Sequence, residues 1–192
     1  MVTGPVGVLA LQGAFQKHID MLHQLGVTAR SVRLPADLAG CAGLIIPGGE
    51  STTMSRLIEA CAFHEELAAF AQTSPVMGTC AGLILMAQEV DDAQVRPLGL
   101  LPCKALRNYY GRQINSFVAP ISLDMDASSE PFRAVFIRSP AVTDLGTGVE
   151  VLARYDGRAV ILGYQHHVAV AFHPELTDDS RIHEHWLRGF LH

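Results

Sequence analysis

The first half of the chain alternates short strand-like segments with amphipathic stretches. Continuous apolar runs lie at 6–11, 44–46 and 76–77, a segment that resembles a shorter strand lies at 27–32, and the amphipathic stretches lie at 15–25 and 63–71. Continuous apolar runs are typical of strands covered on both faces of a sheet, whereas apolar side chains at helical spacing indicate helices that pack on it. The alternation therefore predicts a mostly parallel central sheet with helices on both faces.

The pattern changes after about Gln88, where short apolar runs follow one another. These runs lie at 100–101, 114–123, 134–138, 149–155, 159–163 and 168–172. Asp156-Gly157, between two of them, is typical of a hairpin turn, so we expect antiparallel additions and returning strands here. A helix is expected to close the chain over 178–191. No linker interrupts the sequence, and we expect one α/β domain over residues 1–192, built as a three-layer sandwich.

Composition and charge mainly exclude classes of function. The 192 residues carry 14 basic and 19 acidic side chains, for a net charge of −5, and no basic cluster indicates a nucleic-acid partner. No stretch approaches the roughly 18 apolar residues of a membrane-spanning helix, and the N-terminus lacks the charged region of a signal peptide. Four cysteines lie far apart with no C-x-x-C pair, which argues against disulfides and zinc. We expect a cytoplasmic protein without a metal or cofactor.

The segment Gly78-Thr79-Cys80-Ala81-Gly82 joins the apolar run ending at Met77 to an apolar helix expected over 83–87. A turn that tight needs glycine, because the strand and helix backbones approach closely. Its G-x-C-x-G pattern has the form of the G-x-S-x-G nucleophile elbow. Cys80 would then lie at a helix N-terminus, where N–H groups favour a thiolate and can hold an oxyanion. The alternative is a buried structural cysteine between packing glycines.

Two further segments can supply groups that such a nucleophile needs. His173-Pro174-Glu175 follows the last apolar run, and it offers a base and a carboxylate to orient it. Pro47-Gly48-Gly49-Glu50 follows the run at 44–46 and lacks the G-K-[ST] ending of a phosphate loop, but its N–H groups can complete an oxyanion site. Ser51 or Thr52 is expected to cap the helix that follows. Both glycine-rich turns should lie at the carboxyl edge of the sheet, where ligands bind.

Other polar residues leave alternatives open. Arg107 and Arg138 are candidates for a carboxylate clamp, because the arginine side chain offers paired donors, and either is equally well explained as a surface ion pair. The histidines His166-His167, His183 and His185 have the residue type of metal ligands but lack a complete ligand set, so solvated positions explain them better.

Several motifs together resemble the class I, triad-type glutamine amidotransferases. They are GTCAGL (78–83), PGGEST (47–52) and FHPELT (172–177). LALQGAF (9–15), RNYYGRQINSF (107–117), EPFRAVFIRSP (130–140) and HPELTDDSRIHEHWL (173–187) narrow the resemblance to the glutaminase subunits of pyridoxal 5′-phosphate synthases. The likeness runs from about Val6 to Leu191.

The resemblance implies a flavodoxin-like fold and hydrolysis of L-glutamine to L-glutamate and ammonia through a γ-glutamyl thioester. By position, Cys80 is the nucleophile, His173 the base and Glu175 the group that orients it. The implied glutamine-binding residues are Gly49, Glu50, Ser51, Arg107, Ile137 and Arg138, with oxyanion amides at Gly49 and Ala81. The family passes its ammonia to a (β/α)₈-barrel synthase subunit, which is therefore the implied partner in a hetero-oligomer.

Two departures from the family pattern affect the expected partner surface. Val118-Ala119-Pro120 follows Ser116-Phe117, where the family usually has Glu, and Gln165-His166-His167 replaces a Gln-Gly-Asn-like stretch.

Two other interpretations of the sequence compete with a glutaminase. A thiol-dependent α/β-hydrolase would place its acid before its histidine in the chain, unlike Glu175. A non-catalytic amidotransferase module would be favoured by loss of a triad member, and all are present.

Overall fold

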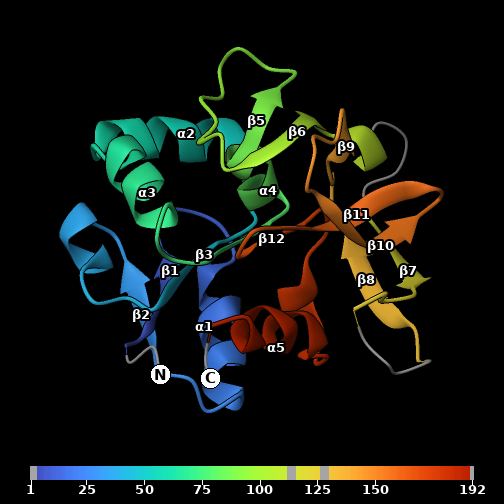
Figure 1. Ribbon diagram of the computed structural model, residues 1–192, viewed down its shortest axis with the longest axis horizontal. Coiled ribbons are helices and arrows are strands. Elements are labelled where there is room, and N and C mark those ends of the chain that lie inside the picture. The colour runs from blue at the N-terminus through green and yellow to red at the C-terminus, as the bar shows by residue number, and fades with distance from the viewer. Residues whose placement is uncertain (1–3, 112–115, 126–129, 191–192) are drawn as a thin grey trace.

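A computed structural model describes residues 4–111, 116–125 and 130–190 of the chain. Its main sheet has seven strands in the order β10-β11-β12-β4-β3-β1-β2 (Figure 1). The five parallel strands are β1 (Val6–Leu9), β2 (Ala29–Val32), β3 (Gly43–Ile46), β4 (Val76–Thr79) and β12 (His167–Val170). The antiparallel edge consists of β10 (Glu150–Tyr155) and β11 (Arg158–Tyr164). The mostly parallel sheet predicted from the sequence is confirmed.

The helices cover both faces of this sheet. They are α1 (Phe15–Gln24), α2 (Ser51–Ala60), α3 (His64–Ala71), α4 (Ala81–Met86) and α5 (Arg181–Arg188). In Figure 1, α1 and α5 lie on one side of the sheet, and α2, α3 and α4 lie on the other. Single 3₁₀ turns lie at Pro35–Leu38, Tyr109–Gly111 and Pro174–Leu176. The result is the expected three-layer arrangement.

The strands of the sheet interior are buried along their whole length. All four residues of β1, β3, β4 and β12 are buried, as expected for parallel strands covered by helices on both faces. The largest side chains of the core include Trp186, Phe63, Phe132, Phe136 and Phe172. No helix in the described part of the chain has the length and apolar character needed to cross a membrane.

Two small sheets lie outside the main sheet. One contains β5 (Ala87–Val90), β6 (Leu101–Leu106) and β9 (Ala141–Thr143), and the other pairs β7 (Phe117–Ile121) with β8 (Phe132–Phe136). Asp156 and Gly157 join β10 to β11 with φ values of +50° and +73°, as a type I′ hairpin turn requires.

Some expected boundaries were wrong. The helix expected over 83–87 ends at Met86, and Ala87 already begins β5. The closing helix begins only at Arg181. The strand expected over 114–123 is seen as Phe117–Ile121, and positions 114–115 lie outside the described residues. The short strands β5 and β9 were not predicted at all.

Candidate active site

Cys80 occupies a strained turn between β4 and α4. Its φ of +49° and ψ of −101° lie in a region that residues with side chains rarely adopt, as in a nucleophile elbow. Glycines on both sides make the turn possible. A Cβ on Gly82 would lie 2.0 Å from the carbonyl oxygen of Ile46, and one on Gly78 would lie 2.6 Å from the carbonyl carbon of Gly82. Both glycines of the motif are therefore required by close backbone packing.

His173 and Glu175 follow the neighbouring strand. β12 pairs in parallel with β4, with Val170 opposite Thr79, so both chains leave the sheet at the same edge. The side chains of His173 and Glu175 meet at 2.7 Å between Nδ1 and Oε1. The backbone N–H of His173 donates to Val135 O at 2.9 Å, which ties this segment to β8. The predicted contact between imidazole and carboxylate is present.

The electrostatics favour a charged imidazole beside the cysteine. Burial alone would lower the pKa of His173, but hydrogen bonds and charge interactions with Cys80 and Glu175 outweigh it and raise the pKa to about 10. Burial would likewise raise the pKa of Glu175, and interactions with His18 and His173 lower it instead. Because the thiolate is the reactive form of cysteine, an adjacent imidazolium provides the charge partner that it needs.

A cavity of about 320 Å³ opens in front of this group. Every residue predicted to bind glutamine lines it, together with Cys80 and His173: Gly49, Glu50, Ser51, Arg107, Ile137 and Arg138. Glu175 and Ala81 are buried, with 3% and 1% exposure, and neither lines the cavity. Gly48, from the 47–50 loop that was predicted to complete an oxyanion site, also lines it, and the remaining lining residues were not predicted as site residues: Gln12, Gly13, Ala14, Ile84, Asn108 and Leu176. Three of them fall in the LALQGAF motif, which was the available signal.

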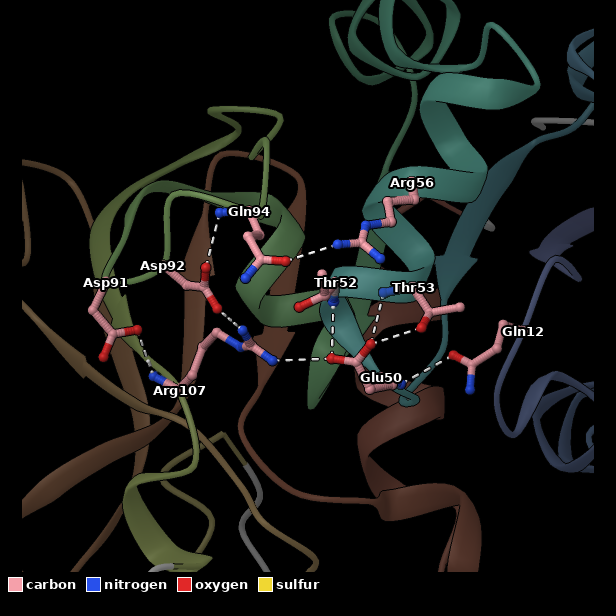
Figure 2. Close-up of polar contacts among 9 residues, drawn as sticks. All are labelled: Gln12, Glu50, Thr52, Thr53, Arg56, Asp91, Asp92, Gln94 and Arg107. Carbon is pink, nitrogen blue, oxygen red and sulfur yellow. Dashed lines mark hydrogen bonds and ion pairs between the residues drawn. The ribbon is translucent and has the colours of Figure 1, made fainter.

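The glycine loop before Glu50 is held against the turn after β1. The carbonyl oxygen of Gly48 accepts from Ala14 N at 3.1 Å, and Glu50 N donates to Gln12 Oε1 at 3.0 Å (Figure 2). Gly13 has a φ of +91°, and a Cβ there would lie 1.9 Å from the Gly48 oxygen. The two turns are therefore packed too closely for any side chain at position 13.

Glu50, and neither Ser51 nor Thr52, caps α2, which corrects the sequence expectation. Its two carboxylate oxygens accept from Thr52 N at 3.0 Å and from Thr53 N at 2.7 Å (Figure 2). Burial would raise the pKa of Glu50, but these hydrogen bonds and that of the Thr53 hydroxyl lower it to about 2. Glu50 is thus a fixed negative charge at the edge of the cavity.

The two candidate arginines differ in their partners. Arg107 Nη2 lies 2.9 Å from Glu50 Oε1, and its Nη1 pairs with Asp92 (Figure 2). Arg138 is exposed, has a φ of +46°, and forms no ion pair within the described part of the chain. The sequence left a carboxylate clamp and an ion pair equally open for both. The structure gives Arg107 the ion pairs, whereas Arg138 lines the cavity and forms no ion pair with the described residues.

The expectation that the other histidines are solvated was wrong for two of them. His183 is 0% exposed and His167 is 4% exposed, whereas His166 and His185 are partly buried. His167 Nδ1 accepts from Val76 N at 3.1 Å, and burial lowers its pKa to about 4. His18, which belongs to none of the predicted sites, is also fully buried. Across residues 4–111, 116–125 and 130–190, no three His, Cys, Asp or Glu side chains gather as a metal site would require.

The chain is similar to known proteins along almost its whole length. The family described as the SNO glutamine amidotransferase family matches residues 8–192. The chain is 48% identical over 188 residues to the pyridoxal 5′-phosphate synthase subunit PdxT of Deinococcus radiodurans, covering 95% of each chain. It is 45% identical over 183 residues to the subunit of the same name from Exiguobacterium sibiricum, covering 95% of this chain and 94% of the other.

Solved structures give the same result. A crystal structure of a glutamine amidotransferase superposes with a TM-score of 0.91 at 39% identity, over 98% of this chain and 100% of the other. PurLQS from Thermotoga maritima, at 17% identity and a TM-score of 0.67 over 98% of each chain, shares the fold. On the match over residues 8–192, the chain belongs to the SNO glutamine amidotransferase family.

Proposed function

We propose that residues 1–192 form one glutaminase domain, which hydrolyses L-glutamine to L-glutamate and ammonia and supplies the ammonia to a pyridoxal 5′-phosphate synthase. The observation that carries the proposal is the 2.7 Å contact of His173 with Glu175 beside the cavity that Cys80 and His173 line together, where β4 and β12 end side by side. Family membership and the relatives named as synthase subunits support the choice of substrate and partner.

The reaction begins with attack of the Cys80 thiolate on the side-chain amide carbon of glutamine. The charged His173 gives its proton to the departing nitrogen, the carbon–nitrogen bond breaks, and ammonia leaves a γ-glutamyl thioester on the sulfur. Neutral His173 then takes a proton from water, which attacks the thioester carbon. The carbon–sulfur bond breaks, glutamate leaves, and the thiolate and imidazolium are restored.

The surroundings of the cysteine assist this chemistry. Glu175 keeps the His173 ring oriented and stabilises its positive charge through the 2.7 Å contact. Backbone amides near Gly49 and Ala81 stabilise the oxyanion that develops on the amide oxygen. Arg138 and Arg107 offer positive charge to the α-carboxylate of glutamine, while Glu50 and Ser51 contribute polar groups and Ile137 a wall of the cavity.

Variants of the three central residues test the proposal. Cys80→Ser and His173→Asn should abolish glutamate release, and Glu175→Ala should lower turnover by about 10²–10⁴-fold, since only ring orientation is lost. A glutamine-like chloroketone should label Cys80 alone. Cys103 is the internal control, because it is 3% exposed and burial raises its pKa to about 12. Labelling that survives in Cys80→Ser would refute the assignment of the nucleophile.

The partner is a (β/α)₈-barrel synthase subunit, and the two chains form a hetero-oligomer in the cytoplasm. In this proposal, docking activates the glutaminase by fixing the 47–50 loop, whose amide must be aimed at the oxyanion. Removing one oxyanion donor of this kind typically lowers kcat by about 10²–10³-fold. The present contacts of Gly48 with Ala14 and of Glu50 with Gln12 define the conformation that docking would alter.

A titration tests this activation. Purified barrel subunit is added to the chain while glutamate release is followed, and complex formation is measured separately by analytical ultracentrifugation. We expect turnover to rise with the fraction of chain in complex. If the complex forms and turnover stays constant, the chain is a constitutive glutaminase and the activation is excluded.

A further inference from the structure

The second oxygen of the Glu175 carboxylate lies at the centre of a polar cluster that the mechanism above does not use. Oε1 is bonded to His173, but Oε2 is fully buried and has no hydrogen bond to any described residue within normal limits. Nε2 of His18 lies 3.5 Å from this oxygen. A buried carboxylate oxygen is costly unless a donor faces it, so the identity of that neighbour matters.

His18 connects three elements behind the cysteine. It lies in α1 and is fully buried. Its Nε2 also lies 3.2 Å from the hydroxyl of Thr79, the residue immediately before Cys80. Its Nδ1 lies 3.0 Å from Nε2 of His183 in α5, across 165 residues of sequence. The cluster therefore runs from the catalytic edge of the sheet to the interface between α1 and α5.

The proton positions in the cluster follow from hydrogen-bond accounting. Burial lowers the pKa of His18, and it lowers the pKa of His183 to about 3, so both rings are neutral near neutral pH. A neutral imidazole has one donor and one acceptor nitrogen, and the contact between the two rings holds a single proton. Only two arrangements of that proton are possible.

One of the two proton arrangements has the lower free energy. If His183 Nε2–H donates to His18 Nδ1, then His18 carries its proton on Nε2 and directs it toward Glu175 and Thr79. The nitrogen left without a partner is His183 Nδ1, as an acceptor, and this atom has no hydrogen bond to any residue that the structure describes. The reverse arrangement would aim a lone pair of His18 at the carboxylate and leave a buried N–H of His183 unpaired, which costs more.

We propose that His18 is a positioning residue for glutamine hydrolysis: its Nε2–H holds the second oxygen of Glu175, and His183 fixes the tautomer that places the proton there. One oxygen of Glu175 is then bonded to His173 and the other faces the N–H of His18 at 3.5 Å, which opposes rotation of the carboxylate away from His173. This inference rests on the proposed glutaminase function. Neither His18 nor His183 lines the cavity, so both act on turnover through Glu175 and not on binding of glutamine.

A matched pair of substitutions separates positioning from packing. His18→Gln keeps an N–H donor near the place of Nε2, toward Glu175. His18→Asn keeps a polar group near the place of Nδ1, toward His183, and does not reach Glu175. We expect His18→Asn to lower kcat ten- to hundredfold with KM for glutamine unchanged, and His18→Gln to restore kcat to within about threefold. His23→Leu, an exposed histidine of the same helix, should match the wild type.

A second measurement does not depend on glutaminase turnover. The rate at which iodoacetamide alkylates Cys80 at pH 7 should fall in His18→Asn and stay near the wild-type rate in His18→Gln, because a loosened Glu175 no longer holds His173 beside the sulfur. If the wild type releases no glutamate even with its synthase partner, the proposed function fails, and the alkylation rates still decide the role of His18.

His183→Leu tests the tautomer. It should also lower kcat and the alkylation rate, since His18 is then free to carry its proton on Nδ1, whereas His183→Gln retains a donor toward His18 and should preserve both. The proposal is overturned if His18→Asn and His18→Gln are equally active or equally impaired, because either result means that the donor toward Glu175 has no role. Thermal unfolding of each variant checks that the comparison is made on folded protein.

Discussion

Gly48 lies directly against the imidazole ring of His173. A Cβ added at Gly48 would come within 2.3 Å of Cε1 and 2.8 Å of Nδ1 of that ring, and within 3.3 Å of the Cβ of Cys80. At Gly48 the loop after β3 thus packs against the ring of His173 without a side chain. This contact gives the 47–50 turn a role in fixing the His173 ring, in addition to any oxyanion donor that the turn supplies.

Gly48→Ala should therefore impair catalysis far more than stability. The added methyl group has to displace the His173 ring, and the contacts of Nδ1 with Glu175 and of the ring with Cys80 are lost or lengthened. We expect kcat to fall at least about 10²-fold, the range of a lost catalytic base. Gly163→Ala is the control, since the nearest atom to its Cβ is the flexible end of Leu152 at 3.3 Å and the next lie at 3.7 and 3.8 Å, and it should retain activity. Steady-state kinetics that leave Gly48→Ala near the wild type would show that the ring has room to move.

The sequence pattern around Cys80 predicted the nucleophile elbow, but no local pattern predicts contacts between residues far apart in the sequence. Gly78, Cys80 and Gly82 are close in sequence, and their spacing alone reports a tight strand-to-helix turn. His18 and His183 meet across 165 residues, so neither could be assigned a partner. One signal was present, because His18 lies between Phe15 and Leu22 on the apolar face of its helix. A polar side chain on such a face indicates a buried hydrogen bond.

The cap of α2 was mispredicted for a related reason. Serine and threonine are the usual capping residues, so the sequence favoured Ser51 or Thr52 over Glu50. The structure uses Glu50 because Arg107, from a distant segment, binds the same carboxylate at 2.9 Å and holds it over the first turn.

The parallel half of the sheet was predictable from its apolar runs. The strands β5 and β9 are short and pair only within a small sheet, so their sequence signal was weak.

Glu50→Ala should affect both stability and substrate binding. The helix loses the acceptor for Thr52 N and Thr53 N, which typically costs about 1 kcal/mol of unfolding free energy. Arg107 also loses one of its two carboxylates, so KM for glutamine should rise. Urea unfolding and steady-state kinetics measure the two effects. Glu59→Ala, an exposed position on the same helix, should change neither, and equal effects of the two substitutions would rule out a special role for Glu50.

The two arginines should respond differently to removal. Arg138→Ala should raise KM about 10–150-fold with unchanged stability, since a charge-assisted hydrogen bond to the glutamine carboxylate is worth roughly 1.5–3 kcal/mol. Arg107→Ala should raise KM and also destabilise the fold, because Glu50 and Asp92 lose their shared counter-charge. Arg133→Ala, exposed on β8, is the control. If neither substitution alters KM, the carboxylate is held by other groups, such as the backbone near Gly49.

Buried neutral histidines should make the fold sensitive to acid. Burial lowers the pKa of His167 to about 4 and that of His183 to about 3, whereas the unfolded chain binds these protons near pH 6.5. Below about pH 6.5 the unfolded chain therefore binds protons at these histidines that the folded chain does not bind. The contribution of these two histidines to the unfolding free energy is fully present above about pH 6.5, and it is lost as the pH falls toward 3–4.

His167→Asn should reduce this acid sensitivity. Asparagine can place its amide oxygen near the position of Nδ1 and still accept from Val76 N, but it does not titrate. We expect the loss of unfolding free energy between pH 7.5 and pH 5 to shrink by about 1–2 kcal/mol in urea unfolding. The raised pKa of His173 acts in the opposite direction, but both proteins contain it, so its contribution cancels in the comparison. His23→Asn, at an exposed site, should leave the pH dependence unchanged. An unaltered pH dependence in His167→Asn would mean that His167 takes up its proton equally in the folded and unfolded chain.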